Sequence, residues 1–503
     1  MENLNERAFL TDTTLDKNKF QKIHKASLEI LKERGLWVGS EALVATAKSH
    51  GLKTDGEKVF FTEYDVEKAI LNASSSNRFT LLARNPKYNI DFNIDYSATG
   101  IGRSAPFIFD PSGKRRQADG NDYISAIKLG QMLDAVQIQG NLVYPGNVSN
   151  DKLFPFMMAN QILYSDKPYN ISSISDLEML CMAFDITPET LKKRDTLSFA
   201  STSSNSHNLS EDDKNEQINT KKNVISYAQS TVNCISPLIL AGDQGDFLIA
   251  MAEHGIAISI SPCPSAGMTG PCSVLGNVIL NNCEVLSILV LTQLIKPGLP
   301  IFYGAFPCSC DMKSMSITYG GPESRMMESG AALMGKAYGL LTRGNVGMND
   351  AQACDFHAGA ESMFCFINAL QNKINFLPGC GIMSSFAAAS LEKLIMDADL
   401  AAYTKRFLEP ITTDDIDELV ELIKTVDPKI NFVTSPHTFT NFRKALHHPT
   451  LFWRTNYDKW EAKGKTLIDQ AAERVSILLK TYSQPPIDLN LASRLKDYTY
   501  SGE

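Results

Sequence analysis

The feature of this sequence that most constrains its fold is a repeated alternation of strand and helix patterns between residues 119 and 409. The strand patterns are short and apolar, as expected for strands buried on both faces of a parallel sheet. They occur at 136–143, 168–173, 232–236, 256–261, 300–304, 341–348 and 374–379. The helix patterns around them lie at 120–134, 151–164, 175–184, 243–254, 272–295, 321–338, 355–371 and 384–407.

Seven strand–helix units predict an α/β fold of the TIM (β/α)8 barrel type rather than an open, doubly wound sheet. No glycine-rich phosphate loop follows the first strand, which also argues against a dinucleotide-binding fold. The eighth strand has no clear pattern. It is either weak or supplied by the chain before Asp110.

The flanks of the barrel region have different patterns. Residues 1–118 predict an α+β extension, with helices near 19–35, 39–50 and 63–73 and alternating strand patterns after them. Residues 410–503 predict a mainly helical C-terminal region. Within the barrel region, residues 188–220 are rich in Ser, Asn and charged residues and predict a mobile surface insertion.

Composition and charge exclude several classes of function. The 503 residues carry a net charge of −8, and the pI is about 5.6, so neither nucleic acid nor an anionic membrane is an expected partner. The apolar run 274–295 contains Asn277, Asn281, Asn282 and Glu284, which favours a buried helix over a membrane span. The N-terminus has no signal-peptide pattern and the ten cysteines form no paired CxxC, so we expect a cytoplasmic protein with reduced thiols.

One strand-to-helix junction, residues 343–361, is crowded with polar groups. Its sequence is RGNVGMNDAQACDFHAGAE. Polar groups at such a position are costly to bury without partners, and residues just after the strand ends line the mouth of a barrel. We therefore expect four catalytic candidates here, namely Asn349, Gln352, His357 and Glu361.

The rest of the expected mouth is aromatic and weakly polar, without the acidic pairs of a sugar or magnesium–phosphate site. A ring face attracts a cation whose charge is buried within methyl groups by roughly 0.5–2 kcal/mol. Candidates for binding such a quaternary amine are Tyr144, Tyr303, Phe306 and Phe356, with the hydroxyl of Thr269. The alternative is that rings at strand ends serve only in packing.

Arg343 lies within a strand that we expect to be buried, where a guanidinium requires a carboxylate partner. The partner is either a structural Asp or Glu or the carboxylate of a ligand, and the sequence leaves both open. His357 and Glu361 are four residues apart on one helix face. With Cys354, or with Cys308 and Cys310, they are zinc ligands by type. No compact ligand motif is present, so we expect no metal.

Several long segments, in order along nearly the whole chain, resemble the trimethylamine methyltransferase family in its branch without pyrrolysine. Near the N-terminus these are HKASLEILKERGLWV, FTLLARNP and IFDPSGKRRQADGNDY. The most specific are SPCPSAGMTGPCSVLGNVILNNCEVLSILVLTQLIKPGLPIFYG, GPESRMMESGAALMGKAYGL and TRGNVGMNDAQACDFHAGAES. Near the end, SPHTFTNFRKALHHP and YDKWEAKG also match.

The resemblance implies a TIM barrel that demethylates a betaine-type quaternary amine. The methyl group would pass by direct in-line displacement to the Co(I) cobalamin of a separate corrinoid protein. The cobalamin would arrive with that partner, so we expect no tightly bound cofactor of the chain's own. Because a quaternary ammonium leaves without protonation, the main task of the barrel would be orientation. We also expect a homo-oligomer.

Two departures from the family pattern bear on the substrate. Members with pyrrolysine carry it near the junction where this chain has Asn349 and Gln352, which argues against trimethylamine. Betaine-demethylating members often end the seventh strand in a histidine where this chain has Pro378, so proline betaine, carnitine, γ-butyrobetaine and choline compete with glycine betaine. Arg343 matches the family and is the candidate for the substrate carboxylate. A zinc-dependent corrinoid methyltransferase and a non-catalytic quaternary-amine-binding protein are the alternatives.

Overall fold

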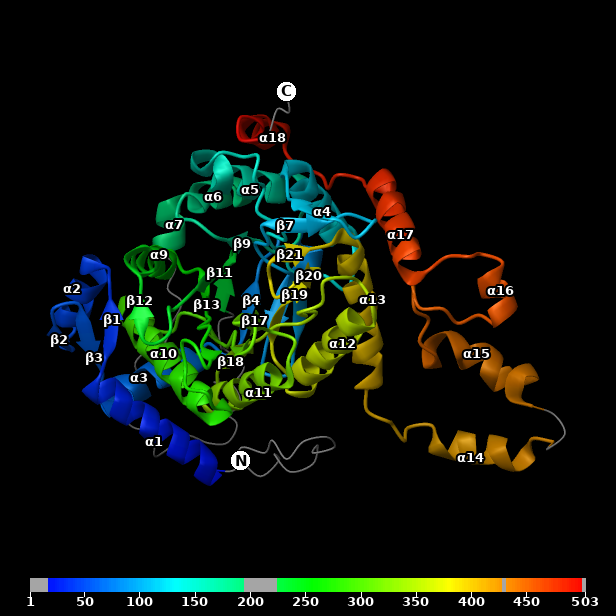
Figure 1. The fold of residues 1–503 in the computed structure, drawn as a ribbon, viewed down its shortest axis with the longest axis horizontal. Coiled ribbons are helices and arrows are strands. Elements are labelled where there is room, and N and C mark those ends of the chain that lie inside the picture. The colour runs from blue at the N-terminus through cyan, green and yellow to red at the C-terminus, as the bar shows by residue number, and fades with distance from the viewer. Residues whose placement is uncertain (1–16, 194–223, 428–430, 500–503) are drawn as a thin grey trace, which may run out of the picture.

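A curved sheet of seven parallel strands forms the centre of the molecule (Figure 1). The structure is a computed structural model, and it describes residues 17–193, 224–427 and 431–499. Each strand pairs with its neighbours in parallel register. Their order across the sheet is β6 (Ala98–Ile101), β19 (Phe376–Cys380), β18 (Leu341–Arg343), β15 (Ile301–Gly304), β13 (Ala257–Ile260), β11 (Gln229–Val232) and β9 (Asn170–Ile171).

The two edge strands of this sheet are joined by the segment 136–143, which closes a barrel. On one side, Gly100 of β6 forms a parallel bridge with Ile138 of the segment. On the other, the Gln139 N–H donates to the carbonyl of Pro168, just before β9, at 3.1 Å. With this segment the ring has eight positions, and the predicted (β/α)8 barrel is confirmed.

The strand that the sequence analysis left unplaced is β6. It comes from the chain before Asp110, one of the two expected sources. The first strand of the barrel in chain order therefore lies before residue 119, in the segment that we assigned to the N-terminal extension.

Eight helices follow the barrel strands and surround the ring (Figure 1). They are α4 (Gly120–Met132), α5 (Asn150–Tyr164), α6 (Asp176–Phe184), α9 (Gly242–Glu253), α10 (Val274–Ile295), α11 (Pro322–Ala337), α12 (Phe356–Gln371) and α13 (Leu391–Phe407). Only α10, among the described residues, is long and apolar enough to cross a membrane. It is mostly buried and packs against α1 (Lys17–Glu33), α3 (Glu63–Ser74), α9 and α11, as a core helix does.

The amino-terminal end of the barrel is plugged by aromatic side chains. The hairpin β4 (Phe79–Leu81) and β5 (Ile90–Phe92), extended by β10 (Val224–Ser226), places Phe79 and Phe92 against Phe302 of β15. Phe302 also contacts Phe376 at the start of β19, with ring centroids 5.6 Å apart. Because this end is filled, a site for chemistry must lie at the carboxyl ends of the strands.

Smaller sheets and short helices complete the region before residue 410. A four-stranded sheet outside the ring contains β12 (Ile239–Leu240), β1 (Leu36–Val38), β3 (Lys58–Phe60) and β2 (Lys53–Asp55), beside α2 (Glu41–Ser49). Two other small sheets carry the loops of the mouth. One contains β14 (Ser265–Ala266), β16 (Cys308–Asp311) and β17 (Ser316–Thr318). The other contains β20 (Ile382–Met383), β21 (Ala388–Ala389), β7 (Phe107–Phe109) and β8 (Arg115–Gln117). Short helices lie at η1 (Pro86–Tyr88) and α7 (Pro188–Lys193); the expected insertion continues beyond the described residues.

Several predicted boundaries are wrong. The strand expected at 341–348 ends at Arg343. The strand expected at 232–236 is β11, Gln229–Val232, whose inward-facing residues, Gln229 and Thr231, are polar. The helix expected from residue 384 starts at Leu391. The preceding residues form the β20–β21 hairpin, and three of its turn residues, Ser384, Ser385 and Phe386, have φ angles of 55°, 51° and 75°, which no helix accommodates.

The chain after residue 409 is helical. Its elements are α14 (Ile416–Thr425), η2 (Phe432–Thr434), α15 (Pro436–Ala445), α16 (Tyr457–Glu461), α17 (Leu467–Thr481) and α18 (Leu489–Lys496). Helix α17 packs on α13 and α4, and α18 packs on α5. Helices α14 to α16 instead loop away from the barrel, at the lower right of Figure 1.

Candidate active site

Two arginines lie at the carboxyl end of the barrel strands. Arg343 is the last residue of β18 and is 8% exposed. Arg103 follows β6 by two residues and is half-buried. Burial and the charge of Arg343 lower the pKa of Arg103 to about 9, and burial lowers the pKa of Arg343 to about 10. Both groups therefore remain protonated at neutral pH and repel each other.

The two guanidinium groups are held by hydroxyl groups. Arg343 Nη1 donates to Ser261 Oγ, and Arg103 Nη1 donates to Thr231 Oγ1 at 2.6 Å. The Nε atom of each arginine is buried without a hydrogen-bond partner. Neutral hydroxyls fix the positions of the two cations without neutralising either charge.

No carboxylate within the described part of the chain lies within 4 Å of either guanidinium. Glu328, whose charge acts on Arg343, is already paired with Arg325 at 2.7 Å. A buried cation without a counter-ion carries an effective penalty of several kcal/mol. The structural ion pair considered for Arg343 therefore lacks its acidic partner, and the geometry is that of an anion-binding site.

Three aromatic rings from different loops form a cluster beside Arg343. Phe306 follows β15, Tyr319 follows β17, and Phe386 lies in the β20–β21 turn. Their ring centroids are 4.7 Å (Phe306–Tyr319), 5.4 Å (Phe306–Phe386) and 6.2 Å (Tyr319–Phe386) apart. The Arg343 guanidinium lies over the Phe306 ring at 5.4 Å. The guanidinium group of Arg343 and an aromatic cluster are thus neighbours.

Asp350, in the junction after β18, ties two of the aromatic loops together. Its Oδ1 accepts hydrogen bonds from the Tyr319 N–H at 2.8 Å and from Ser385 Oγ at 2.9 Å. Its Oδ2 accepts from the Gly320 N–H at 3.0 Å. One carboxylate therefore fixes the backbone beside Tyr319 and beside Phe386.

The loop that carries Phe386 is strained and needs these contacts. Left-handed φ angles at Ser384, Ser385 and Phe386 are unfavourable for residues other than glycine and persist only when the surroundings impose them. Ser384 Oγ donates to the Gln352 side chain at 2.7 Å, and the Ser385 N–H donates to the Asn349 carbonyl at 3.1 Å. Strain of this kind clusters at functional sites, which agrees with the position of Phe386 in the aromatic cluster.

The four catalytic candidates of the junction surround Asp350 and do not reach the arginines. Asn349 is fully buried, and its amide donates to the carbonyls of Gly347 and Ile382, both at 3.1 Å. Gln352 and His357 are exposed. Glu361 accepts from the Asp350 N–H at 2.7 Å and pairs with His357 Nε2 at 2.9 Å. These contacts are those of a scaffold beneath the aromatic cluster.

Of the five residues expected to bind the amine, the structure places two at the mouth. Phe306 belongs to the aromatic cluster, and Tyr144 lies near enough to Arg103 to act on its charge. Tyr303 points outward, where its hydroxyl donates to Asn282 of α10 at 2.8 Å. Phe356 is 90% exposed, and Thr269 is exposed and accepts the Ser265 N–H within its own loop. For Tyr303, Phe356 and Thr269 the expected position was wrong.

Sequence reasoning missed Arg103, Tyr319 and Phe386. Arg103 follows a strand that was not recognised as part of the barrel, so its place at the mouth was hidden. The available signal was a charged residue two positions after an apolar strand pattern, in the segment ATGIGRS. Tyr319 and Phe386 lie in hairpins outside the barrel repeat, where no periodicity marks them.

The thiols and acids of the mouth do not converge on a metal site. Within the described ranges, no three His, Cys, Asp or Glu side chains are close enough together to hold a metal ion. Cys354, considered as a ligand with His357 and Glu361, instead places its Sγ 3.4 Å from the sulfur of Met383. Cys263 Sγ lies 3.5 Å from the Tyr319 hydroxyl, and its hydrogen bond with Cys308, together with burial, raises the pKa of its thiol.

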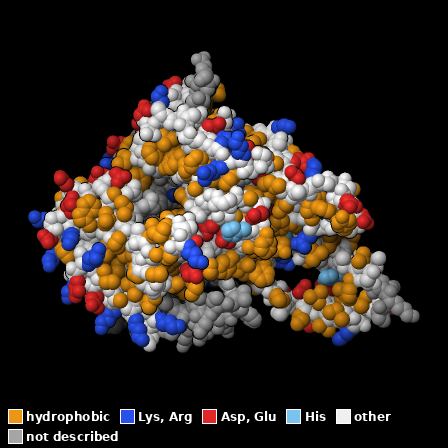
Figure 2. Space-filling view, viewed as in Figure 1, with side chains coloured by type: hydrophobic (Ala, Val, Ile, Leu, Met, Phe, Trp, Pro, Cys, Tyr) orange, Lys and Arg blue, Asp and Glu red, His pale blue; other side chains and the backbone are white. Residues whose placement is uncertain are grey.

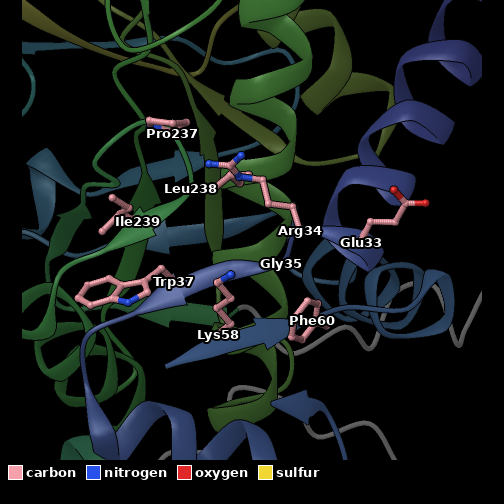
Figure 3. A pocket seen from close by; sticks show the side chains of 9 residues that line it. All are labelled: Glu33, Arg34, Gly35, Trp37, Lys58, Phe60, Pro237, Leu238 and Ile239. Carbon is pink, nitrogen blue, oxygen red and sulfur yellow. The ribbon is translucent and has the colours of Figure 1, made fainter. Parts of the chain in front are cut away.

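A surface cleft of about 550 Å³ lies outside the barrel, between the β1 sheet and the loop after β11 (Figure 3). Its charged side chains, Glu33, Arg34 and Lys58, are exposed at its edge, and Trp37 and Phe60 form part of its wall. Solvated charges of this kind need no ligand. The arginine pair is the stronger candidate for a site. The molecule is hollowed over β9 and β11 in Figure 2.

Comparison with known proteins agrees with this geometry. The sequence pattern of the trimethylamine methyltransferase (MTTB) family matches residues 3–184 and 216–501. The chain belongs to this family. Residues 185–215 do not match the family pattern, and they overlap the polar insertion expected at 188–220.

Relatives within the MTTB family act on several methylated amines. The glycine betaine methyltransferase of Desulfitobacterium hafniense (strain Y51) is 29% identical over 486 residues, 96% of each chain. The L-carnitine:corrinoid methyltransferase of Eubacterium limosum is 25% identical and covers 85% of this chain and 84% of its own. The proline betaine:corrinoid methyltransferase of the same organism is 25% identical, covering 82% and 81%. The expected branch of the family, without pyrrolysine, is confirmed.

Proposed function

We propose that this protein is a methyltransferase that moves a methyl group from a carboxylate-bearing quaternary amine to the cobalt(I) cobalamin of a separate corrinoid protein. Family membership and the named activities of the relatives support methyl transfer to a corrinoid. The single observation that carries the choice of donor is the pair of protonated arginines without carboxylate partners, beside an aromatic cluster.

In this proposal the donor's carboxylate binds between Arg343 and Arg103. It would supply the counter-ion that neither guanidinium has and would relieve the repulsion between them. Each charge-assisted hydrogen bond contributes about 1.5–3 kcal/mol. Ser261 and Thr231 then serve to aim the guanidinium groups at one point.

The trimethylammonium end of the donor binds at the rings of Phe306, Tyr319 and Phe386. Each ring face contributes roughly 0.5–2 kcal/mol to holding a quaternary ammonium. The distance of 5.4 Å between the Arg343 guanidinium and the Phe306 ring places the two binding surfaces side by side. That spacing suits a small molecule that carries both charges.

The reaction requires orientation and no proton transfer. The C–N bond breaks with both electrons left on nitrogen, while the methyl carbon bonds to cobalt, which supplies the electron pair. Because the nitrogen is already cationic, it leaves as a neutral amine without a general acid. Holding the methyl group in line between nitrogen and cobalt converts an encounter into an oriented step, an effect worth up to about 7–11 kcal/mol in favourable cases.

The corrinoid enters as a second substrate on its own protein, and its planar ring system suits the aromatic wall of the mouth. We assign no ligand of the cobalt to this chain. Asn349, Gln352 and Glu361 act in this account as positioning residues for the loops of Phe386 and Tyr319. The arginine pair favours glycine betaine, proline betaine, carnitine or γ-butyrobetaine over choline, which lacks a carboxylate.

The test is to mix the protein with a reduced corrinoid protein and each of these amines, and to record the absorption spectrum of methylcobalt. We expect the spectrum to appear with at least one carboxylate-bearing amine and not with trimethylamine. Its absence with every amine of the panel would contradict the proposal. Tight binding of a betaine without any methyl transfer would instead identify a binding protein.

A further inference from the structure

The segment between α13 and α17, which we call the arm, exposes an unusual number of apolar side chains. Not one residue of α14, α15 or α16 is buried. Figure 1 shows the arm looping out from the barrel, and Figure 2 shows apolar groups gathered on it at the lower right. The exposed large apolar residues are Ile411 (98%), Ile416 (53%), Val420 (42%), Ile423 (65%), Phe432 (42%), Val433 (75%), Phe439 (76%), Leu446 (62%), Tyr457 (65%) and Trp460 (37%).

These side chains are ordered along the helices and are not scattered. Ile416, Val420 and Ile423 of α14 are spaced by four and three residues, so they share one helix face. A helix with one apolar face normally turns that face toward a core. The apolar face of α14 is open to solvent, which marks an interaction surface.

The charges of the arm indicate what covers it. Residues 414–427 contain six acidic residues and a single lysine. The rest of the described arm, residues 431–466, is net positive, with six basic residues (Arg443, Lys444, Arg454, Lys459, Lys463 and Lys465) and two acidic ones (Asp458 and Glu461). The two halves of the arm are therefore opposite in charge, so the surface is complementary to itself.

We propose that the arm is the interface with a second copy of this chain, with the acidic α14 of one copy on the basic α15 of the other. A two-fold contact brings the same patch of both copies together, and it requires a self-complementary surface of this kind. A corrinoid protein that leaves after each methyl transfer would uncover the apolar residues in every cycle. A second copy covers them permanently. This inference does not depend on the reaction that the barrel performs.

The first experiment measures the mass of the full-length protein by sedimentation equilibrium over a range of concentrations. We expect a dimer of the 55.4 kDa chain. We expect the double variant Ile423→Glu, Phe439→Glu to raise the dissociation constant of this dimer at least about 100-fold, because two-fold symmetry places each new charge in the interface twice. Leu71→Glu is the matched control: Leu71 is 71% exposed on α3, outside the arm, and its substitution leaves the dimer intact. Unchanged melting temperatures verify that each variant folds.

The second experiment reverses charges. Asp417→Lys with Glu421→Lys in one variant, and Arg443→Glu with Lys444→Glu in another, each place like charges across the interface and weaken self-association. Mixing the two variants restores opposite charges in a mixed dimer, which we expect to be tighter than either variant alone.

Three results would overturn the proposal. The first is a wild-type monomer at micromolar concentration. The second is an oligomer that the arm substitutions leave unchanged, since its interface must then lie elsewhere. The third is an arm variant of unchanged mass that loses binding to the corrinoid protein, because the arm would then be the docking surface for that partner.

Discussion

Replacing Arg343 by methionine distinguishes the two roles open to this buried guanidinium, because they predict opposite effects on the ligand-free protein. A structural ion pair that loses its arginine leaves a buried carboxylate uncompensated and is destabilised by about 3–5 kcal/mol. In the structure, Arg343 contacts the neutral Ser261 hydroxyl and is repelled by Arg103. Methionine fills much of the volume of the arginine stem without its charge. We expect the free energy of unfolding to stay within about 1 kcal/mol of wild type or to increase.

The same substitution should weaken the binding of a carboxylate-bearing amine. The loss of one charge-assisted hydrogen bond corresponds to about 1.5–3 kcal/mol, or roughly 10- to 150-fold in the dissociation constant. Arg103 remains, so binding is weakened and not abolished. The methyl ester of the same amine keeps the trimethylammonium group and lacks the carboxylate charge, so its affinity should change by less than about threefold.

Urea denaturation of the ligand-free variant and titration calorimetry with the amine and its ester are the two measurements required. Arg343→Lys is the matched control, because it keeps a positive charge and loses the planar guanidinium geometry. A large loss of stability in Arg343→Met, or equal losses of affinity for the amine and the ester, would contradict the role in carboxylate binding.

Three further predictions follow from particular contacts. Asp350→Ala removes three accepted hydrogen bonds beneath Tyr319 and Phe386, so KM for the amine should increase roughly tenfold with little change in kcat. Asp350→Asn, which keeps one acceptor oxygen, should recover part of the lost affinity. An unchanged KM in Asp350→Ala would contradict the positioning role. Burial raises the pKa of Asp176 to about 7, so the folded state binds a proton more tightly than the unfolded chain and this residue lowers stability as pH increases from about 4 to 7. Asp176→Asn keeps an oxygen acceptor for the Ser172 and Ser173 N–H groups. In urea denaturation this variant should be more stable than wild type by roughly 1–4 kcal/mol at pH 8 but not at pH 4. Equal stability of variant and wild type at pH 8 would contradict this prediction. His357→Ala breaks a half-exposed contact with Glu361, so the rate of methyl transfer should stay near that of wild type and the free energy of unfolding should change by no more than about 1 kcal/mol. A large loss of the methyl-transfer rate would return His357 to catalysis.

The barrel could be predicted from the sequence because its outer layers follow simple patterns. Helices α11 and α12 begin and end within a few residues of their expected positions, since their apolar faces recur at helical spacing. Helix α10 does so because it is one long apolar run. The predicted position of β11 was shifted toward the C-terminus because its inward-facing residues, Gln229 and Thr231, are polar and the residues after it have the apolar pattern of a buried strand. A polar barrel interior and a surface strand leave the same pattern in a sequence.

The candidate site could be predicted only in part. Arg343 was identified because a charge within an apolar strand is conspicuous, but its neighbour Arg103 depends on β6 joining the barrel, a pairing of residues almost 280 positions apart. Tyr303 was misplaced because a strand buried on both faces gives no sign of which residues point inward, and Phe302 takes that place. The left-handed turn that carries Phe386 has no glycine to announce it.

The most direct test of the central claim is a single-turnover reaction with an amine labelled with ¹³C in its methyl groups, followed by NMR. We predict that one labelled methyl group per amine appears on the cobalt of the corrinoid protein. The demethylated amine keeps its carboxylate, and Arg343→Met slows the transfer. Labelled methylcobalt from trimethylamine or choline, but from none of the carboxylate-bearing amines, would contradict the account.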